Sequence, residues 1–599
     1  MEATTTTSAQ AGTGSKTIAD LLARAVERYA DKPAVRFKRD GEWQDISFAQ
    51  VGEAVSEIAR GLIDLGIAPG ERVSILCNTR PEWTYADFAI SSAGAVVVPI
   101  YPTNSPEECE WVAGNSESVA IVCEDASQVD KIVAVRDRLP HLKTIIAVDP
   151  AGDVADAISL EDVRERGRGV DEAELQSRTE AVRREDPFTF IYTSGTTGPP
   201  KGCVLSHGNY RDVLNMCTSL DVLEEGETTY LFLPLAHAFA LLIQLLSYDV
   251  GGTIAYFGGD PKQIVPELQE IKPTYFPSVP RIFEKIYTLA APNIRQEMGD
   301  EAFEQMVKLG VQVRELQVAG KDVPAELKQK FDALDEKVFA NVRSIFGGRV
   351  RQAVTGAAPI APDILEFFYA CGVPVLEGYG MTETATVATY STIEDHRFGT
   401  VGRALPGVEA KIADDGELLL KGGNIFQGYY KNEDASFGTI VDGWLHTGDL
   451  GSIDEDGYIS ITGRKKDIII TAGGKNLTPA NIENDLKQSR WISQAVMHGD
   501  RRPYPVVLIT LDPEEIIPWA KEQGLPEDLA ELSEHPKVQE LIGEIVDKTN
   551  AKYAQVEQVK KFAILDHDLS QETGELTPTL KVKRNVVNEK YQGIFDSLY

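Results

Sequence analysis

Short apolar runs separated by helix-length segments are the feature that most limits how this chain can fold. Residues 72–77, 95–100, 119–123 and 144–148 are predicted to be buried strands, and residues 85–93 between the first two are predicted to be a helix. Strands that are buried on both faces are typical of parallel or mixed sheets covered by helices. The sequence therefore predicts an α/β protein.

The same alternation resumes further along the chain. Residues 229–233 and 253–257 are predicted strands, and residues 238–248 between them are a predicted helix. We therefore expect a large N-terminal body built from two β-sheets covered by helices. Residues 401–463 change to strands and tight turns, with Asp-Gly hairpin signals at Gly416 and Gly457, which predicts a small β-rich subdomain.

A helical segment interrupts the body at about residues 284–346. Its apolar residues recur at spacings of three and four, which predicts one apolar stripe along a helix packed on the body. The stripe consists of Leu327, Phe331, Leu334, Val338, Val342 and Ile345.

The length of 599 residues exceeds one ordinary hydrophobic core, so more than one domain is expected. Residues 1–16 are rich in Thr, Ser, Gly and Gln and are predicted to be a disordered lead. Residues 17–465 would form the N-terminal domain. Residues 466–599 would form a smaller α+β C-terminal domain of ordinary size.

Composition limits which molecules the protein can bind and in which cellular compartment it is expected. The net charge of −33 opposes binding to nucleic acid polymers. Six dispersed cysteines without a CxxC pair favour a reducing compartment, and neither a signal peptide nor a bilayer-spanning run is evident. We expect a cytoplasmic protein without a transmembrane segment. Peripheral contact with the inner membrane face stays open, and so does the choice between monomer and homodimer.

An apolar run at residues 188–191 leads directly into a loop suited to polyphosphate. Its glycines let backbone N–H groups approach phosphate oxygens, and its hydroxyl groups and a lysine add donors. The spacing is not that of a Walker A loop, because Pro200 precedes Lys201 and Gly202 follows it. A plain surface turn is the simpler alternative. The predicted phosphate-binding residues are Thr193, Ser194, Gly195, Thr196, Thr197, Gly198 and Lys201.

Further stretches combine glycines with charged or hydroxyl residues. They are Gly356-Ala357-Ala358-Pro359, Gly378-Tyr379-Gly380-Met381-Thr382-Glu383-Thr384, Thr447-Gly448-Asp449, Gly463-Arg464-Lys465-Lys466-Asp467, Ala472-Gly473-Gly474-Lys475-Asn476 and Leu576 to Arg584 around Lys581. Together with the phosphate loop they resemble the motifs of the adenylate-forming superfamily, which includes acyl-CoA synthetases, luciferases and adenylation domains. The long helical segment resembles bacterial long-chain fatty-acyl-CoA synthetases most.

The resemblance implies a nucleotide site. Residues matching Gly356, Ala357, Gly378, Tyr379 and Gly380 line the adenine pocket in that family. Those matching Thr382 and Glu383 contact the α-phosphate and the metal, and those matching Asp449 and Arg464 hold the ribose. A carboxylate beside polyphosphate would repel it by about 4 kcal/mol, so Glu383 is predicted to act through Mg²⁺.

The resemblance also implies moving parts. Lys581 matches the lysine that a mobile C-terminal domain delivers to the α-phosphate, with Lys583 as a second candidate. Lys466 matches the hinge of that domain, and Gly473, Gly474 and Lys475 match the loop that shapes the coenzyme A tunnel. His237 matches a histidine beside the acyl carboxylate, where a catalytic, a gating and a purely structural role are all open.

The implied activity is that of a ligase that joins a long-chain fatty acid to coenzyme A with ATP and Mg²⁺, through an acyl-adenylate. A fatty acyl-AMP ligase and an aryl or medium-chain acid–CoA ligase are alternatives within the same chemistry. A noncatalytic nucleotide-binding regulator is the alternative outside it.

Overall fold

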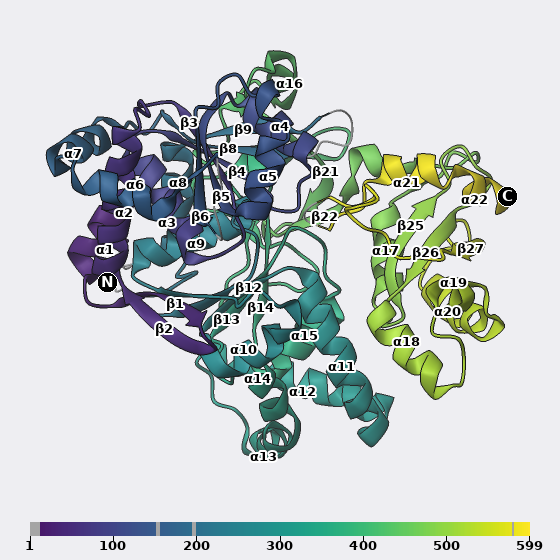
Figure 1. Cartoon of the computed structure of the whole chain (residues 1–599). Coiled ribbons are helices and arrows are strands. Elements are labelled where there is room, and N and C mark those ends of the chain that lie inside the picture. The colour runs from purple at the N-terminus through teal and green to yellow at the C-terminus, as the bar shows by residue number, and fades with distance from the viewer. Residues whose placement is uncertain (1–11, 151–155, 194–198, 578–579) are drawn as a thin grey trace.

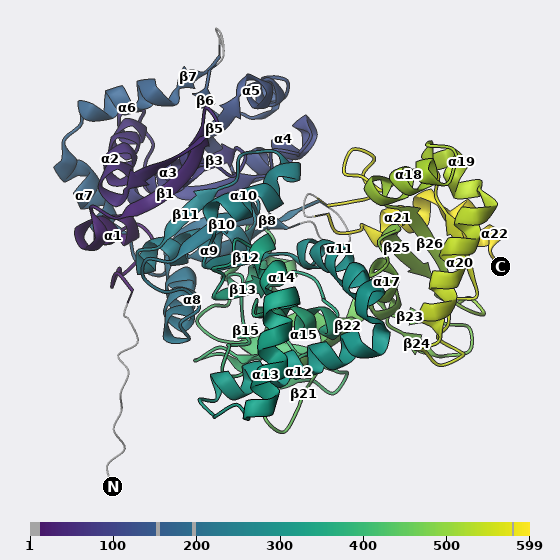
Figure 2. The same cartoon turned by 90° about the horizontal axis from the view of Figure 1, so that it is seen from below.

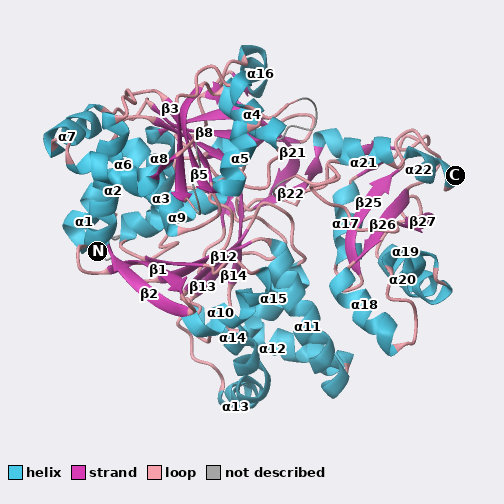
Figure 3. Ribbon diagram, in the orientation of Figure 1, coloured by secondary structure: helices cyan, strands magenta, loops and turns pink. Residues whose placement is uncertain are grey.

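The computed structural model describes residues 12–150, 156–193, 199–577 and 580–599. Figure 1 shows a large body, which is formed by the N-terminal part of the described chain, and a smaller C-terminal lobe beside it. Figure 2 shows the same division after a quarter turn. The predicted α/β fold is confirmed, and Figure 3 shows strands flanked by helices in both parts.

The first sheet of the body has the strand order β19-β9-β8-β4-β3-β5-β6-β7. Its central strands are parallel, whereas β8, β9 and β19 pair antiparallel. The predicted parallel or mixed sheet is thus confirmed, and it is a mixed one. The strands are β3 (Arg72–Leu76), β4 (Val96–Ile100), β5 (Ser118–Asp125), β6 (Thr144–Asp149), β7 (Ile158–Ser159), β8 (Pro187–Thr193), β9 (Lys201–Ser206) and β19 (Gly428–Tyr429).

The second sheet confirms the second predicted alternation and has the order β16-β15-β14-β13-β12-β10-β11-β1-β2. Its members are β1 (Pro33–Arg39), β2 (Glu42–Ser47), β10 (Thr228–Leu231), β11 (Thr253–Tyr256), β12 (Tyr275–Ser278), β13 (Gln352–Thr355), β14 (Val375–Tyr379), β15 (Thr389–Tyr390) and β16 (Arg403–Ala404).

The helices of the body cover both sheets (Figure 1). The most apolar is α9, which is buried along almost its whole length because it packs into the core shared by the two sheets. The helices outside the insertion are α1 (Leu21–Tyr29), α2 (Phe48–Asp64), α3 (Pro81–Ser92), α4 (Pro106–Asn115), α5 (Ala126–Val133), α6 (Leu160–Arg168), α7 (Glu172–Ala181), α8 (His207–Ser219), α9 (Ala238–Val250), α10 (Ile264–Ile271) and α15 (Pro362–Cys371).

The region of the predicted helical insertion is a cluster of helices packed on the second sheet and α15. It consists of α11 (Pro280–Met298), α12 (Asp300–Val318), α13 (Ala325–Leu334), a π-helical turn (Asp335–Phe339) and α14 (Ala340–Ile345). Phe331 and Val342 of the predicted stripe are buried, and its other members pack against the same apolar core. The stripe is therefore the inner face of the insertion.

The predicted β-rich subdomain is also confirmed. It contains β17 (Glu409–Ile412), β18 (Glu417–Lys421), β20 (Ile440–Val441), β21 (Trp444–Ile453) and β22 (Ile459–Arg464), with α16 (Glu433–Thr439) beside them. Gly416 and Gly457 adopt positive φ angles of 87° at the two predicted hairpin turns, a conformation that glycine adopts without steric cost.

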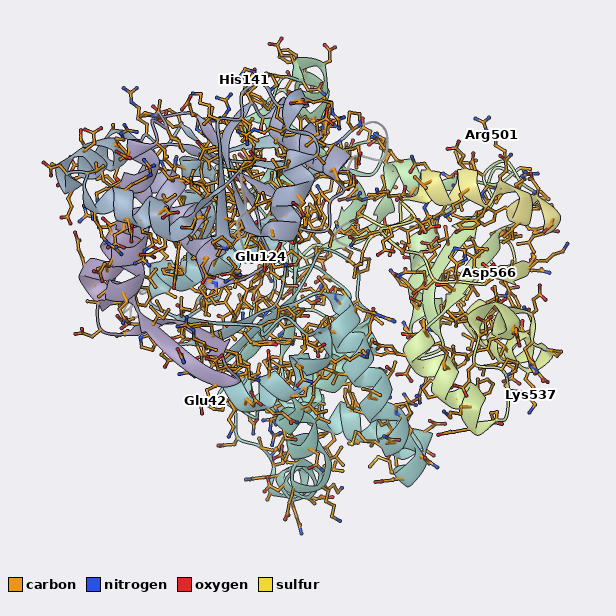
Figure 4. The ribbon with its side chains drawn as sticks, viewed as in Figure 1. Glu42, Glu124, His141, Arg501, Lys537 and Asp566 are labelled. Atoms are coloured by element: carbon orange, nitrogen blue, oxygen red, sulfur yellow. The ribbon has the colours of Figure 1, made fainter. Side chains whose placement is uncertain are left out.

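The C-terminal lobe has its own apolar cores on the two faces of a small sheet. This sheet consists of β25 (Ile492–His498), β26 (Val506–Leu511) and β27 (Lys561–Ile564), and a separate pair of strands is formed by β23 (Ile469–Ile470) and β24 (Asn476–Leu477). Its helices are α17 (Pro479–Lys487), α18 (Pro513–Glu522), α19 (Leu529–Glu534), α20 (Pro536–Asn550), α21 (Arg584–Lys590) and α22 (Gln592–Ser597). Polar side chains project from the outer surfaces, among them His141 on the body and Arg501, Lys537 and Asp566 on the lobe (Figure 4).

One boundary of the predicted disordered lead needs correction. Residues 12–16 pack on the body instead, although residues 1–11 lie outside the described residues. The Thr13 amide and hydroxyl donate to Asp249 Oδ1 at 3.1 and 2.5 Å, and Ser15 accepts a hydrogen bond from Arg211. The same Asp249 forms a buried ion pair with Arg211 at 2.8 Å. Residues 12–16 are polar, but they pack on the body because the buried Arg211–Asp249 pair supplies hydrogen-bond partners for Thr13 and Ser15.

We predict that Asp249→Ala lowers the free energy of unfolding by about 3–5 kcal/mol, because it leaves the Arg211 guanidinium buried without its counter-charge. Asp45→Ala is the matched control, since the Arg36–Asp45 pair is partly solvent-exposed, and its cost should stay below about 1 kcal/mol. Denaturant titration of both variants checks the difference. Equal losses would contradict this assignment.

Candidate active site

The strands on either side of the predicted phosphate loop form a hairpin in the first sheet. Thr193 at the end of β8 pairs with Lys201 at the start of β9. Of the loop itself, the predicted residues Ser194, Gly195, Thr196, Thr197 and Gly198 lie outside the described residues. The indole N–H of Trp111 donates to the Pro200 carbonyl at 2.8 Å, so α4 fixes the strand that carries Lys201.

The predicted metal ligand lies close to Lys201. Glu383 occupies a short 3-10 turn (Thr382–Thr384) that follows β14, and it is only 6% exposed. The hydroxyl of Tyr429 donates to Glu383 Oε1 at 2.7 Å, and Lys201 Nζ lies 5.2 Å from the centre of the same tyrosine ring. Two strands of the first sheet, β9 with Lys201 and β19 with Tyr429, thus lie beside the Glu383 carboxylate, which follows β14 of the second sheet.

The two predicted walls of the adenine pocket are neighbours. β13 and β14 are parallel and align Thr355 with Glu377, which places Gly356 beside Gly378. A Cβ atom on Gly356 would lie 2.9 Å from the Gly378 carbonyl oxygen, so this close approach needs glycine. Ala357 adopts a φ of 68°, an uncommon left-handed conformation for a residue with a side chain.

Gly380 is equally constrained. A Cβ atom there would lie 2.1 Å from the Thr386 carbonyl oxygen, which would force the turn after β14 apart. Thr382 and Glu383 belong to this turn. Gly380 therefore determines where their side chains lie relative to the end of β14.

The predicted ribose residues form one network with the adenine tyrosine. Asp449 on β21 and Arg464 on β22 are cross-strand partners, and Arg464 Nε donates to Asp449 Oδ1 at 3.1 Å. The Tyr379 hydroxyl donates to Asp449 Oδ2 at 2.6 Å. Burial, followed by the charge of Asp449, raises the pKa of Tyr379 well above its usual value, so the phenol keeps its proton.

Lys581 reaches this network from the C-terminal lobe. Two contacts between described residues fix its backbone: the Thr577 amide donates to the Lys581 carbonyl, and the Lys581 amide donates to Thr577 Oγ1. Lys583 is two positions further along the chain, and its amide donates to the Glu575 carbonyl at 2.7 Å. The Lys581 ammonium experiences the charges of Arg464, Asp449 and Glu383.

The environment of Lys581 lowers its pKa to about 8. Loss of hydration is the main cause, the charge of Arg464 adds to it, and Asp449 and Glu383 oppose it. The side chain nevertheless remains accessible to solvent. Lys581 therefore lies where two domains meet, surrounded by protein on several sides but still in contact with water.

A buried carboxylate, Glu575, lies in the segment that precedes Lys581. Glu575 is fully buried and accepts hydrogen bonds from Lys590, Tyr591 and the Ser570 amide. Its pKa is lowered to about 2, because these donors outweigh the cost of burial.

His237 caps the N-terminus of α9. Its Nδ1 accepts a hydrogen bond from the Phe239 amide at 3.2 Å. Burial and then the charge of Lys581 lower its pKa to about 3, so the ring is neutral at pH 7. With Nδ1 as acceptor, the proton belongs on Nε2. The histidine has a structural role as a helix cap and also lies within the electrostatic reach of Lys581.

The predicted hinge and coenzyme A loop lie outside this network. Lys466 belongs to a short 3-10 turn (Lys465–Asp467) that follows β22, and Gly473 and Gly474 lie in the exposed turn between β23 and β24. The ammonium of Lys475 pairs with Glu557 of the same lobe at 3.1 Å. In this arrangement the structure therefore brings Lys581, and not the Gly473–Lys475 loop, to the body.

Ion pairs join α11 of the body to the C-terminal lobe. Arg281 contacts Asp512 at 2.6 Å, and Lys285 contacts Glu514. Both pairs are at least partly exposed.

Sequence reasoning missed Tyr429, which contacts both Glu383 and Lys201. A tyrosine in a Gly-Tyr-Tyr run carries no signal of its own, because aromatic residues are common in strands. Only the pairing of β19 with β9 reveals its role.

The protein was compared with known proteins. A family model described as AMP-binding enzyme matches residues 22–430, and one described as AMP-binding enzyme C-terminal domain matches residues 466–599. The chain belongs to the AMP-binding enzyme family. It is 40% identical to the long-chain-fatty-acid–CoA ligase FadD15 of Mycobacterium bovis, over 94% of this chain and 93% of the relative. It is 33% identical to the long-chain-fatty-acid–CoA ligase ACSBG2 of Xenopus laevis, over 97% and 84%.

Solved structures share the fold of this AMP-binding enzyme. The anthranilate CoA ligase AuaEII in complex with anthranoyl-AMP has a TM-score of 0.74 at 21% identity, covering 97% of this chain and 98% of that one. ATP-bound MatB from Rhodopseudomonas palustris has a TM-score of 0.70 at 24% identity, covering 96% and 99%. These likenesses support the fold, including a body, a β-rich subdomain and a C-terminal domain.

Glu383 suits a magnesium ion. Its carboxylate is buried. Among the described residues it forms hydrogen bonds with the Tyr429 hydroxyl and the Cys203 thiol, and it has no partner at ion-pair distance. No cluster of three or more His, Cys, Asp or Glu that could hold a metal ion occurs in the described part of the chain. One carboxylate completed by substrate phosphates is a usual way to hold Mg²⁺.

In the part of the chain that the structure describes, every helix is too short or too polar to cross a bilayer.

The pKa of Lys581 predicts a pH dependence for adenylate formation. Since the pKa is lowered to about 8, the ammonium is present below pH 8 and is lost as the pH rises through this value. We expect kcat/KM for acid-dependent pyrophosphate release to fall about ten-fold per unit above pH 8. The assay omits coenzyme A, so that its thiol does not contribute to the profile. A constant rate up to pH 10 would exclude Lys581 as the cation required.

Proposed function

We propose that this AMP-binding enzyme is an ATP-dependent long-chain fatty acid–CoA ligase. It activates a fatty acid as acyl-AMP with release of pyrophosphate and then transfers the acyl group to coenzyme A. The observation that carries the proposal is the convergence of Lys201, Glu383, Asp449, Arg464 and Lys581 from three parts of the fold. The relatives named long-chain-fatty-acid–CoA ligase support the substrate class.

The chemistry assigns each group a task. A carboxylate is a poor acyl donor because oxide is a poor leaving group, whereas AMP leaves readily. The protein must hold the fatty acid carboxylate in line with the α-phosphorus of ATP and stabilise the charge on its oxygens. In our proposal the Thr193–Lys201 hairpin holds the β- and γ-phosphates, Asp449 and Arg464 hold the ribose, and Lys581 neutralises the α-phosphate.

Magnesium, held by Glu383, would supply charge neutralisation at the phosphates. His237 would face the carboxylate as a neutral donor through Nε2. This assignment is supported by its position at the N-terminus of α9, where backbone N–H groups favour an anion.

The second half-reaction requires Lys581 to leave. We propose that residues 466–599 rotate about Lys466 and bring Gly473, Gly474 and Lys475 to the body, where they would shape the path of coenzyme A. The C-terminal family match, which begins at residue 466, supports this boundary.

The proposed location is the cytoplasm. All six cysteines are buried free thiols, which suits a reducing compartment. Contact with the inner membrane face would give access to fatty acids, and the active unit would be a monomer or a homodimer.

A panel of acids tests the substrate class. Acids from acetate to about C20, with a benzoate and a cinnamate, are scored by thioester formation with coenzyme A. We expect the highest kcat/KM for the long-chain acids. Preference for an aryl or medium-chain acid, or acyl-AMP formation without coenzyme A dependence, would support one of the alternative ligases, and no acid-dependent pyrophosphate release would support a noncatalytic regulator.

We predict that Lys581→Ala lowers acyl-adenylate formation at least 100-fold while thiolysis of supplied acyl-adenylate falls less than about three-fold. Lys583→Ala is the matched control, because this residue lies two positions away, and it should retain both half-reactions. The half-reactions are measured separately by pyrophosphate release and by thioester formation. Equal loss of both in Lys581→Ala would contradict the proposed division of labour.

A further inference from the structure

Tyr429 lies between two charged side chains of opposite sign. It belongs to β19, which pairs antiparallel with β9 and sets Tyr429 opposite Cys203. Lys201 is two positions before Cys203 on β9 and therefore points to the same face of the sheet. Tyr429 and Lys201 are thus diagonal cross-strand neighbours, a relation that places a long side chain over an aromatic ring.

The tyrosine is fixed on more than one side. Its amide donates to Ser436 Oγ at 2.8 Å, and its ring packs on Phe426 with 4.9 Å between ring centres. The Phe426 amide in turn donates to the Glu383 carbonyl oxygen at 2.9 Å. One short segment therefore holds both the backbone and the side chain of Glu383.

The two charges do not pair with each other. Within the described residues, neither Lys201 nor Glu383 has an oppositely charged group at ion-pair distance, although both contact Tyr429. A direct Lys–Glu pair would satisfy both groups and would oppose the binding of polyphosphate and metal between them. The phenol gives the carboxylate a neutral donor and the lysine a π-face, and neither contact consumes a charge.

We propose that Tyr429 is a positioning residue that holds Glu383 and Lys201 apart, so that the carboxylate stays available to a magnesium ion and the ammonium to polyphosphate. The inference rests on the proposed roles of these two residues in nucleotide binding. It does not depend on which acid is activated, because neither contact involves the acyl group.

Tyr429→Phe isolates the hydroxyl, since the ring remains under Lys201. Mn²⁺ serves as the probe in place of Mg²⁺, and its binding to the full-length protein with ATP is followed by electron paramagnetic resonance. We expect the Kd for Mn²⁺ to rise about ten-fold, as for the loss of one hydrogen bond to a charged group. Binding of ATP in EDTA, measured by calorimetry, should change less than two-fold.

Tyr429→Leu removes the ring as well and lets Glu383 approach Lys201. We therefore expect ATP binding in EDTA to weaken about ten-fold in addition. Tyr430→Phe is the matched control, because the neighbouring hydroxyl contacts Glu117 at 3.1 Å and its ring packs on Phe190. This control should bind Mn²⁺ and ATP as the unmodified protein does.

A Glu383→Gln background separates positioning from general damage. If Tyr429 acts through the carboxylate, Tyr429→Phe adds no further loss of Mn²⁺ binding there. A full additional loss, an equal loss in Tyr430→Phe, or unchanged Mn²⁺ binding in Tyr429→Phe would each overturn the proposal. Because the titrations contain neither fatty acid nor coenzyme A, their outcome is distinct from that of the acid panel.

Discussion

The carboxylate of Asp449 is the contact on which the arrangement of the site depends. It lies on the β-rich subdomain and is 4% exposed, yet it accepts hydrogen bonds from Tyr379 of the second sheet and from Arg464. A buried carboxylate without such partners would be costly, so the subdomain can pack here only in the register that supplies them. The chain enters the Lys465–Asp467 turn directly after Arg464, so the same contact also fixes where the C-terminal lobe begins.

The site carries local charges that the composition does not reveal. The chain as a whole is strongly acidic, but Lys201, Arg464 and Lys581 come from separate elements to the proposed nucleotide site. Such an array is preorganised for an anion, because folding places its donors before a substrate arrives. The low pKa of His237 fits the same description, since burial, and after it the charge of Lys581, disfavours a protonated imidazole.

Much of this was predictable from sequence, because strands, the apolar stripe and the hairpin glycines are local patterns. The stripe through Phe331 and Val342 followed from spacing alone, and Gly416 and Gly457 from turn chemistry. The family motifs indicated Asp449 and Arg464, but not that Tyr379 binds the same carboxylate. Contacts between residues far apart in the sequence were not predicted, because local patterns do not show them. Tyr429 lies 46 positions from Glu383, and Thr13 lies 236 positions from Asp249. Composition suggested disorder for residues 12–16 because it does not show a buried partner.

The contacts between α11 and the lobe have an energetic consequence. The Arg281–Asp512 and Lys285–Glu514 pairs reach solvent, and exposed pairs of this kind contribute about 0–1 kcal/mol each. These two pairs therefore stabilise this orientation of the lobe only weakly, and dissolved salt screens them further. Other orientations of the lobe would then differ by little free energy, so that substrate binding and product release could bias its position without an external energy source.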